Sequence, residues 1–206
     1  MSNIRNLLAA ALLASAGNAV AASSVDLTVK GLITPSACRP SLANEGVADF
    51  GKISAKDLKP DWPTYPPWQT MQMTITCEAA TLIAIAAKDN REGSDSYGDY
   101  STFGLGLIND SEKLGFLRIS PSKTYADGIY LATIGSRDGG ATWEREVSFM
   151  DDGLTAFAVP GTFIPVAFRQ LTTDLYIRPA IAPSKDLTLT KEEVIDGSVT
   201  LTVHYL

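Results

Sequence analysis

The sequence predicts an all-β protein whose strands form a sandwich. Three observations predict this class. Almost nothing after residue 22 has the period of a long helix, short apolar or alternating runs recur, and turn residues separate them. Because no internal repeat, low-complexity stretch or linker divides the chain, we expect one domain with a full-sized core.

Residues 1–22 have the features of a secretory signal peptide. Arg5 supplies a positive start, Leu7–Ala14 is an apolar run, and Ala19–Ala22 offers small residues for cleavage. The apolar run is shorter than the roughly 20 residues that span a bilayer, and no later run reaches that length. We therefore expect an exported protein without direct membrane insertion.

The charge pattern argues against two classes of partner. The formal net charge is −6, and it becomes −7 without the leader, whose only charged residue is Arg5. The remaining charges are dispersed along the chain. Nucleic-acid binding requires clustered Lys and Arg, and adsorption to an anionic membrane requires a basic surface, so we expect neither.

The stretch Ser24–Ile33, directly after the leader, alternates between apolar and polar side chains. This pattern predicts a strand with one buried face. Two interpretations are open: an ordinary first strand within its own sheet, or a strand that completes a neighbouring molecule. The positions on the face to be buried are Val25, Leu27, Val29, Gly31 and Ile33.

Both cysteines, Cys38 and Cys77, lie in the exported part. An even number of cysteines in an oxidising compartment predicts one disulfide. Such a bridge ties the beginning of the body to a strand about forty residues further on. Two free buried thiols are the alternative.

Strands and turns follow in order along the body. We expect strands at 47–51, 71–77 and 81–87, one helical turn within 52–59, and a polar surface loop at 88–102. Turn residues predict two hairpins, 103–108 with 114–120 and 129–136 with 142–150, and another turn at 151–153. Strands at 163–169, with Pro165 at an edge or bulge, and at 171–182 follow.

The last predicted strand, Ser198–Leu206, alternates to the final residue. Thr200, Thr202 and His204 face one way. The opposite face carries Val199, Leu201, Val203 and Tyr205. We expect no strand after it to close the sheet.

These features resemble a chaperone–usher fimbrial subunit, or pilin, of a divergent fimbrial-type family. The resemblance spans nearly the whole exported chain and rests on the order and spacing of its motifs. The motifs are Val25–Ile33 followed by Cys38, then Val47–Gly51, Met71–Cys77, Gly104–Asp110 and the penultimate Tyr205.

The resemblance implies an incomplete immunoglobulin-like sandwich, the pilin fold. Residues 1–22 are then a signal peptide, 23–34 an N-terminal donor-strand extension, and 35–206 the pilin-like domain. The groove beside the last strand first receives a strand of a periplasmic pilus chaperone. At an outer-membrane usher, the extension of a neighbouring fimbrial subunit replaces it. The protein is then expected in the periplasm and later on the cell surface, in a fimbrium that serves adhesion or biofilm formation.

The residues give little support for catalysis. His204 is the only histidine, no Gly-x-Ser-x-Gly elbow or P-loop is present, and Gly104-x-Gly106 lacks a third glycine and a following helix. We expect no catalytic residue, cofactor or metal, although a carboxylate pair for glycoside hydrolysis stays open. One acidic loop lacks the spacing of a calcium loop and is interpreted as solvated; it carries Asp89, Glu92, Asp95 and Asp99.

The segment Lys59–Trp68 combines three aromatic residues with four prolines. Trp62, Tyr65 and Trp68 could form a stacking platform for a sugar or a partner surface. Alternatively, the loop folds these aromatics over the edge of the sandwich. The leading hypothesis is a fimbrial structural subunit, the alternative is a free-standing exported sandwich that binds carbohydrate or protein, and an exported enzyme ranks third.

Overall fold

A computed structural model describes residues 37–206 of the chain. The expected leader and the expected donor strand, with Val25, Leu27, Val29, Gly31 and Ile33, lie outside the described residues. The 3-10 helices are η1 (Ala43–Gly46), η2 (Ala55–Asp57) and η3 (Ser184–Asp186). The strands are β1 (Cys38–Leu42), β2 (Gln69–Thr81), β3 (Ile83–Asp89), β4 (Phe103–Gly104), β5 (Leu107–Ile108), β6 (Glu112–Lys113), β7 (Gly115–Ala126), β8 (Ile129–Ser136), β9 (Glu144–Arg145), β10 (Leu154–Ala158), β11 (Phe168–Ile181) and β12 (Val199–Tyr205).

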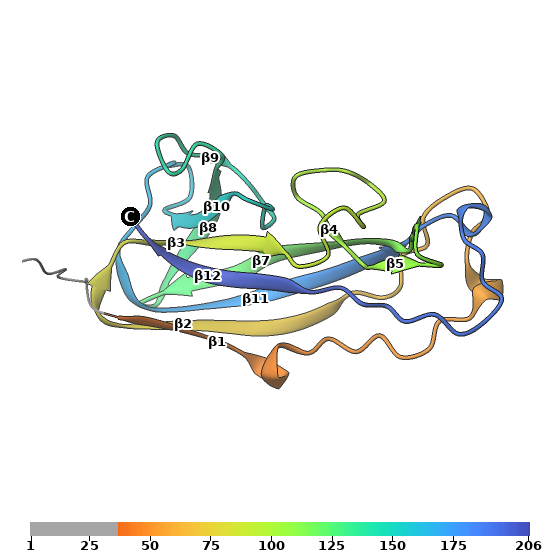
Figure 1. The fold of residues 1–206 in the computed structure, drawn as a ribbon. Helices are drawn as coiled ribbons and strands as arrows, with labels where there is room; N and C mark the ends of the chain where they lie inside the picture. Colours follow the sequence, from red (N-terminus) through yellow and green to blue (C-terminus); the bar gives the residue numbers. More distant parts are fainter. Residues whose placement is uncertain (1–36) are drawn as a thin grey trace, which may run out of the picture. The chain divides into compact units, whose positions relative to one another are not determined.

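The strands form an antiparallel sandwich, which confirms the predicted all-β class. One layer has the order β1-β2-β11-β7 and the other has the order β8-β10-β3-β12 (Figure 1). A short pairing of β7 with β8, from Thr124↔Leu131 to Ala126↔Ile129, connects the layers at one seam. At the opposite seam, β1 and β12 are the two ends of the strand order within residues 37–206.

The core lies between the two layers and follows the alternation of the strands. Met71, Met73 and Ile75 of β2 are at most 4% exposed, and the polar residues between them point outward. Ile83 and Ile85 of β3 belong to the same apolar cluster. The half-buried residues Val199, Leu201 and Val203 of β12 pack against this cluster, so the expected inward face of the last strand is confirmed.

Strand β10 is a strand that the sequence pattern did not predict. All five of its residues are buried, because its second face lies under a smaller apolar cluster. That cluster includes Ala156, Ala158 and Ile134 of β8, and Trp143 packs against it. A strand that is covered on both faces does not alternate, so its sequence lacks the period-two signal.

Two predicted strands are wrong, and a third is mostly wrong, since only β9 within residues 142–150 is a strand. Residues 47–51 contain no strand: Ala48 and Phe50 pack against the core, but the chain pairs with no strand among residues 37–206. Most of residues 163–169 is also irregular, since β11 begins only at Phe168, and its bulge lies between Phe168 and Gln170 rather than at Pro165. Pro165 has no backbone N–H to offer a ladder, and Ile164 beside it is 74% exposed.

The predicted disulfide is confirmed. Cys38 and Cys77 are bonded with an S–S distance of 2.01 Å, and they are directly paired residues of β1 and β2. Their sequence separation is 39. The bond therefore fixes edge strand β1 to the sandwich at its first residue.

Replacing both cysteines with alanine should destabilise the fold. Closing a loop of this size contributes about 4 kcal/mol by the chain-entropy relation. We expect the free energy of unfolding in urea to fall by about this amount, while the urea dependence of the free energy changes little. A double variant as stable as the oxidised wild-type protein would show that the bridge contributes nothing to β1 docking.

Candidate functional site

The site that stands out is an apolar groove at the open seam of the sandwich, which we call the seam groove. It consists of two joined hollows of about 230 and 520 Å³ that share Ala48, Phe50 and Ile195. One lip is the irregular chain after β1, residues 42–58, and the other is residues 189–201, which lead into β12. Buried side chains form its floor, among them Leu105, Leu117, Ile119, Leu175 and Ile177.

Backbone topology explains why the groove exists. Within residues 37–206, β1 pairs only with β2 and β12 pairs only with β3. The two edges converge where the Cys38 N–H donates a 2.9 Å hydrogen bond to the Tyr205 hydroxyl. Further along, Leu42 and Leu201 line a hollow instead of touching across a ladder. The orange chain after β1 and the blue chain before β12 follow this seam (Figure 1).

The predicted acceptor residues take different places along this seam. Val199 and Leu201 line the groove, whereas Val203 packs against the core beyond it. Tyr205 is 38% exposed, and its hydroxyl ties the end of β12 to β1. Sequence patterns missed the other lip, to which Ala48, Phe50 and Ile53 contribute. Ala48 and Phe50 lie in the stretch predicted as a strand, and Ile53 lies in the stretch predicted to contain a helical turn.

One ion pair connects the two lips of the seam groove. The Lys52 ammonium lies 2.6 Å from the Glu192 carboxylate, and both residues line the larger hollow. Their side chains are 88% and 76% exposed, so the pair contributes little to stability. Close by, Glu193 has a carboxylate oxygen that is buried without a hydrogen bond, and the Lys191 ammonium lies 3.6 Å from it.

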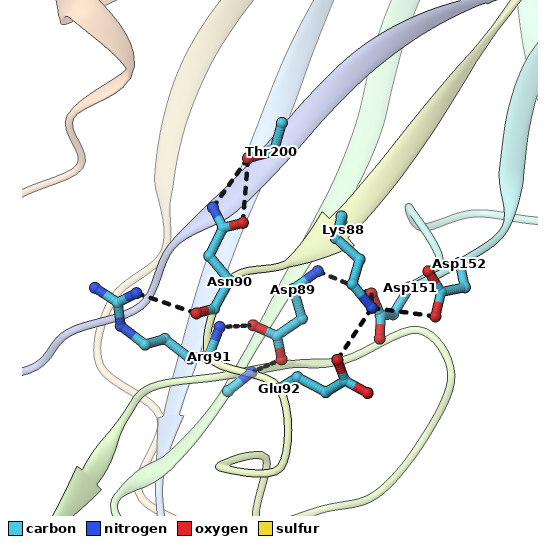
Figure 2. A network of polar contacts seen from close by, with 9 residues as sticks. Lys88, Asp89, Asn90, Arg91, Glu92, Asp151, Asp152 and Thr200 are labelled. Carbon is cyan, nitrogen blue, oxygen red and sulfur yellow. Dashed lines mark hydrogen bonds and ion pairs between the residues drawn. The ribbon is translucent and has the colours of Figure 1, made fainter.

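A polar network anchors the lip that leads into β12 (Figure 2). At its centre, the buried Asp89 carboxylate accepts hydrogen bonds from the N–H groups of Arg91 and Gly104, both at 2.7 Å. A side chain at position 104 would collide with Ser94 Oγ and the Arg91 carbonyl oxygen, so this glycine serves close packing. Asp89 thus joins the turn after β3 to β4.

Asn90 and Arg91 extend the network to the groove lip. The Asn90 side chain donates to the hydroxyls of Ser198 and Thr200, each at 3.0 Å. The Arg91 guanidinium binds Asp196 with two hydrogen bonds of 2.7 and 2.8 Å. These bonds position residues 196–200, which form the entrance to β12, over the edge of β3.

Lys88 connects the network to the turn before β10. Its ammonium group lies 3.2 Å from the carboxylates of Glu92 and Asp152 (Figure 2). The hydrogen bonds that Lys88 donates, first to Asp152 and then to Glu92, raise its pKa. The Asp89 N–H in turn donates to Asp151, so the turn after β3 and the turn before β10 form one unit.

The predicted solvated loop is only partly solvated. Ser94, Ser101 and Thr102 are buried, and the acidic side chains bind the loop itself. Asp95 accepts from the N–H groups of Tyr97 and Gly98, and Asp99 accepts from Ser101. Within residues 37–206, no group of three His, Cys, Asp or Glu side chains is arranged to hold a metal ion.

The predicted surface aromatics are exposed. Trp62, Tyr65 and Trp68 are 73%, 55% and 61% exposed. Tyr65 packs edge-on against Phe116, and Trp68 contacts Tyr176 of β11. No ring contact of Trp62 occurs in the described part of the chain. In residues 37–206, no helix is long and apolar enough to cross a bilayer.

Fold and site together define a β-sandwich with one disulfide and a groove along an open seam. Comparison with known proteins adds two similarities. Residues 27–107, which include β1 to β4, match a family described as "Protein of unknown function (DUF1120)". The matched region contains the disulfide, one groove lip and the turn at Asp89.

Two full-length relatives come from Escherichia coli (strain K12). The chain is 28% identical to Protein GltF in an alignment of 244 positions, which covers 97% of this chain and 96% of the relative. It is 29% identical to Uncharacterized protein YhcF in an alignment of 241 positions, which covers both proteins completely. The similarity therefore extends over the whole sandwich, including both lips of the seam groove.

Changing Asp89 to Asn should destabilise the protein by about 1.5–3 kcal/mol, because the variant loses charge-assisted hydrogen bonds to buried N–H groups. Urea unfolding measures this loss. Glu92→Gln is the control, since Glu92 contacts only the exposed Lys88 among the described residues and should change stability by less than about 1 kcal/mol. Equal effects of the two substitutions would contradict the assigned role of Asp89.

The Arg91–Asp196 pair should make stability depend on pH. Hydrogen bonding to Arg91 lowers the pKa of Asp196 below 3.8. The pair therefore stabilises the fold above about pH 4, and this stabilisation is lost as the pH falls through the lowered pKa. Asp196→Asn should show a smaller loss of stability between pH 5 and pH 3 than the wild type. Because the side chains are 36% and 55% exposed, we expect a small difference, and parallel curves would contradict it.

Proposed function

We propose that this chain is a structural subunit of a chaperone–usher fimbria that polymerises by donor-strand exchange. The observation that carries the proposal is the seam groove, whose smaller hollow lies between Leu42 of β1 and Val199 and Leu201 of β12. An extended strand inserted there gains ladder hydrogen bonds from the edges and apolar contacts from the floor. The proposed occupant is the Ser23–Ile33 segment of a second copy or of a related subunit.

The chemistry of the segment and of the groove agree. The groove floor is aliphatic, and the segment offers Val25, Leu27, Val29 and Ile33 on one face. Burial of each stabilises the complex by about 1.5–3 kcal/mol, and each ladder hydrogen bond adds about 1 kcal/mol. Ordering the segment costs about 1–2 kcal/mol per residue. Burial and the ladder hydrogen bonds together therefore offset an ordering cost of similar size.

The proposal includes the route that such a subunit takes. A free edge beside an apolar groove invites aggregation, so the subunit requires a periplasmic chaperone before assembly. An outer-membrane usher then exchanges the chaperone strand for the extension of the neighbouring subunit. The assembled fibre lies on the cell surface and contributes to adhesion or biofilm formation. In this proposal the chain is not an enzyme; His204 is exposed on β12 and serves no reaction.

A second candidate function is a free-standing module that binds carbohydrate or protein. The observation in its favour is the set of exposed aromatics Trp62, Tyr65 and Trp68. In that case the protein is a monomer, and the N-terminal strand stabilises its own domain.

Deletion of Ser23–Ile33 separates the two functions. For a fimbrial subunit, we expect wild-type polymers that persist in unheated detergent, and no such polymers from the deletion variant, which the chaperone still captures. Gel electrophoresis and chaperone co-purification measure these outcomes. A wild-type protein that remains monomeric when co-expressed with the cognate chaperone and usher would contradict the proposal.

A pair of groove variants tests the site itself. Leu201→Trp fills the seam groove and should abolish polymers, because Leu201 lines it. Thr202→Trp adds the same ring to the exposed face of β12 and should leave polymers intact. Urea unfolding of both variants shows whether the sandwich still folds. Loss of polymers in both, or in neither, would mean that the seam groove is not the acceptor.

A further inference from the structure

The outer face of the β2-β11-β7 layer carries an unusual row of side chains. From Thr172 to Arg178, the even-numbered residues of β11 point away from the core, as the exposure of Arg178 and the partial exposure of Tyr176 show. Arg178 is paired directly with Arg118 of β7. On its other side, Trp68 directly precedes β2, where Gln69 pairs with Ile177. Trp68, Arg178 and Arg118 thus form one row across three neighbouring chain segments, which we call the arginine row.

Two arginines of like charge face each other in this row. Like charges directly opposite each other on adjacent strands destabilise a sheet. Among residues 37–206, neither guanidinium lies within 4.0 Å of a carboxylate oxygen. The Arg118 Nε atom is buried and has no hydrogen-bond acceptor in the same range. The two guanidinium groups therefore have no directly bound anionic partner among residues 37–206.

Asp99 interacts electrostatically with Arg118 without forming an ion pair with it. The pKa of Asp99 is lowered mainly by hydrogen bonds from Ser101, and only to a lesser extent by the charges of Arg118 and Arg137. The Asp99 carboxylate accepts the Ser101 N–H at 2.8 Å and the Ser101 hydroxyl at 2.6 Å. The Asp99 carboxylate is thus hydrogen-bonded within its own loop.

Aromatic rings flank the arginines on both sides. The Trp68 ring is 61% exposed and lies 5.9 Å from the Arg178 guanidinium carbon and 6.5 Å from the Tyr176 ring. On β7, Phe116 lies two residues before Arg118 and is covered by the exposed rings of Tyr65 and Tyr97. The face thus combines flat apolar surface with two planar cations.

This combination fits one class of ligand. Guanidinium groups bind carboxylates through paired hydrogen bonds, and aromatic faces pack against the apolar face of a sugar ring. Nucleic acid is disfavoured, because the chain has a net charge of −6 and the row offers only two cations. Arginine and aromatic residues are also enriched in protein interfaces, so an acidic peptide is the competing ligand that the test includes.

We propose that the arginine row binds an acidic saccharide, with Arg118 and Arg178 on its carboxylate and Trp68 against its ring. Trp68 lines a further hollow with Phe50 and Ile53 of one groove lip. The two arginines of this site lie apart from the floor of the seam groove, because the outward side chains of β7 and β11 carry them and the inward side chains form the groove floor. The proposal therefore stands or fails independently of fibre assembly.

The test uses the purified full chain and isothermal titration calorimetry. The probe is a galacturonic acid hexamer, and the comparison is a neutral glucose hexamer. We expect measurable binding of the acidic hexamer that weakens as salt increases, and at least tenfold weaker binding of the neutral one. The R118Q/R178Q double variant and Trp68→Ala should each lower the affinity for the acidic hexamer at least tenfold.

Two matched controls lie elsewhere on the chain. Arg169→Gln removes an exposed arginine at the other end of β11, and Trp62→Ala removes an exposed tryptophan that has no ring contact in the described residues. Both should bind like the wild type. If the double variant does not fold, Arg178→Gln carries the test alone, because Arg178 is exposed.

Four results would overturn the proposal. The first is no binding of the acidic hexamer, and the second is equal binding of the neutral one. The third is an unchanged affinity in the arginine variants. The fourth is equal binding of a glutamate hexapeptide, which would show that the row recognises carboxylates on any chain rather than a sugar.

Discussion

The unpaired edges of β1 and β12 are the constraint on which the rest of the structure depends. Backbone N–H and C=O groups require partners, and an apolar cavity beside them requires filling. Within residues 37–206, β1 and β12 are the two ends of the strand order, and the seam groove lies beside them. The seam is therefore the place where the fold is most ready to accept a further strand.

Several contacts elsewhere in the sandwich anchor the two strands that border this seam. The Cys38–Cys77 bond fixes β1 to β2, and the Tyr205 hydroxyl joins the end of β12 to β1. At the other end of β12, Arg91 binds Asp196 in the approach to the strand. Both edges are thus anchored in the sandwich while their facing sides stay available. A preorganised groove lowers the entropy that is lost on binding a strand.

The sequence patterns predicted the strands that have one buried face, and for a physical reason. Where a strand alternates, as in Met71–Cys77 and Val199–Tyr205, its period of two is visible in the side chains. β10 is buried on both faces, so its side chains do not alternate and the period of two is absent. Residues 47–51 alternate without pairing, because in the described structure they line a groove rather than join a sheet.

The site was harder to predict than the fold. One lip follows from the inward face of β12, but its anchor depends on contacts between residues about a hundred positions apart, such as Arg91 with Asp196. The arginine row depends on register, because Arg118 and Arg178 are neighbours only through the pairing of β7 with β11. No local pattern encodes such a contact, so it becomes visible only in three dimensions.

Hydrogen exchange along β12 tests the central claim most directly. The claim is that a strand from a second copy pairs with the free edge of β12 in the assembled state. Amide exchange over Val199–Tyr205 should be at least a hundredfold slower in wild-type polymers than in monomers that lack Ser23–Ile33, while β11 exchange stays the same. Equal exchange of β12 in the two states would contradict the account.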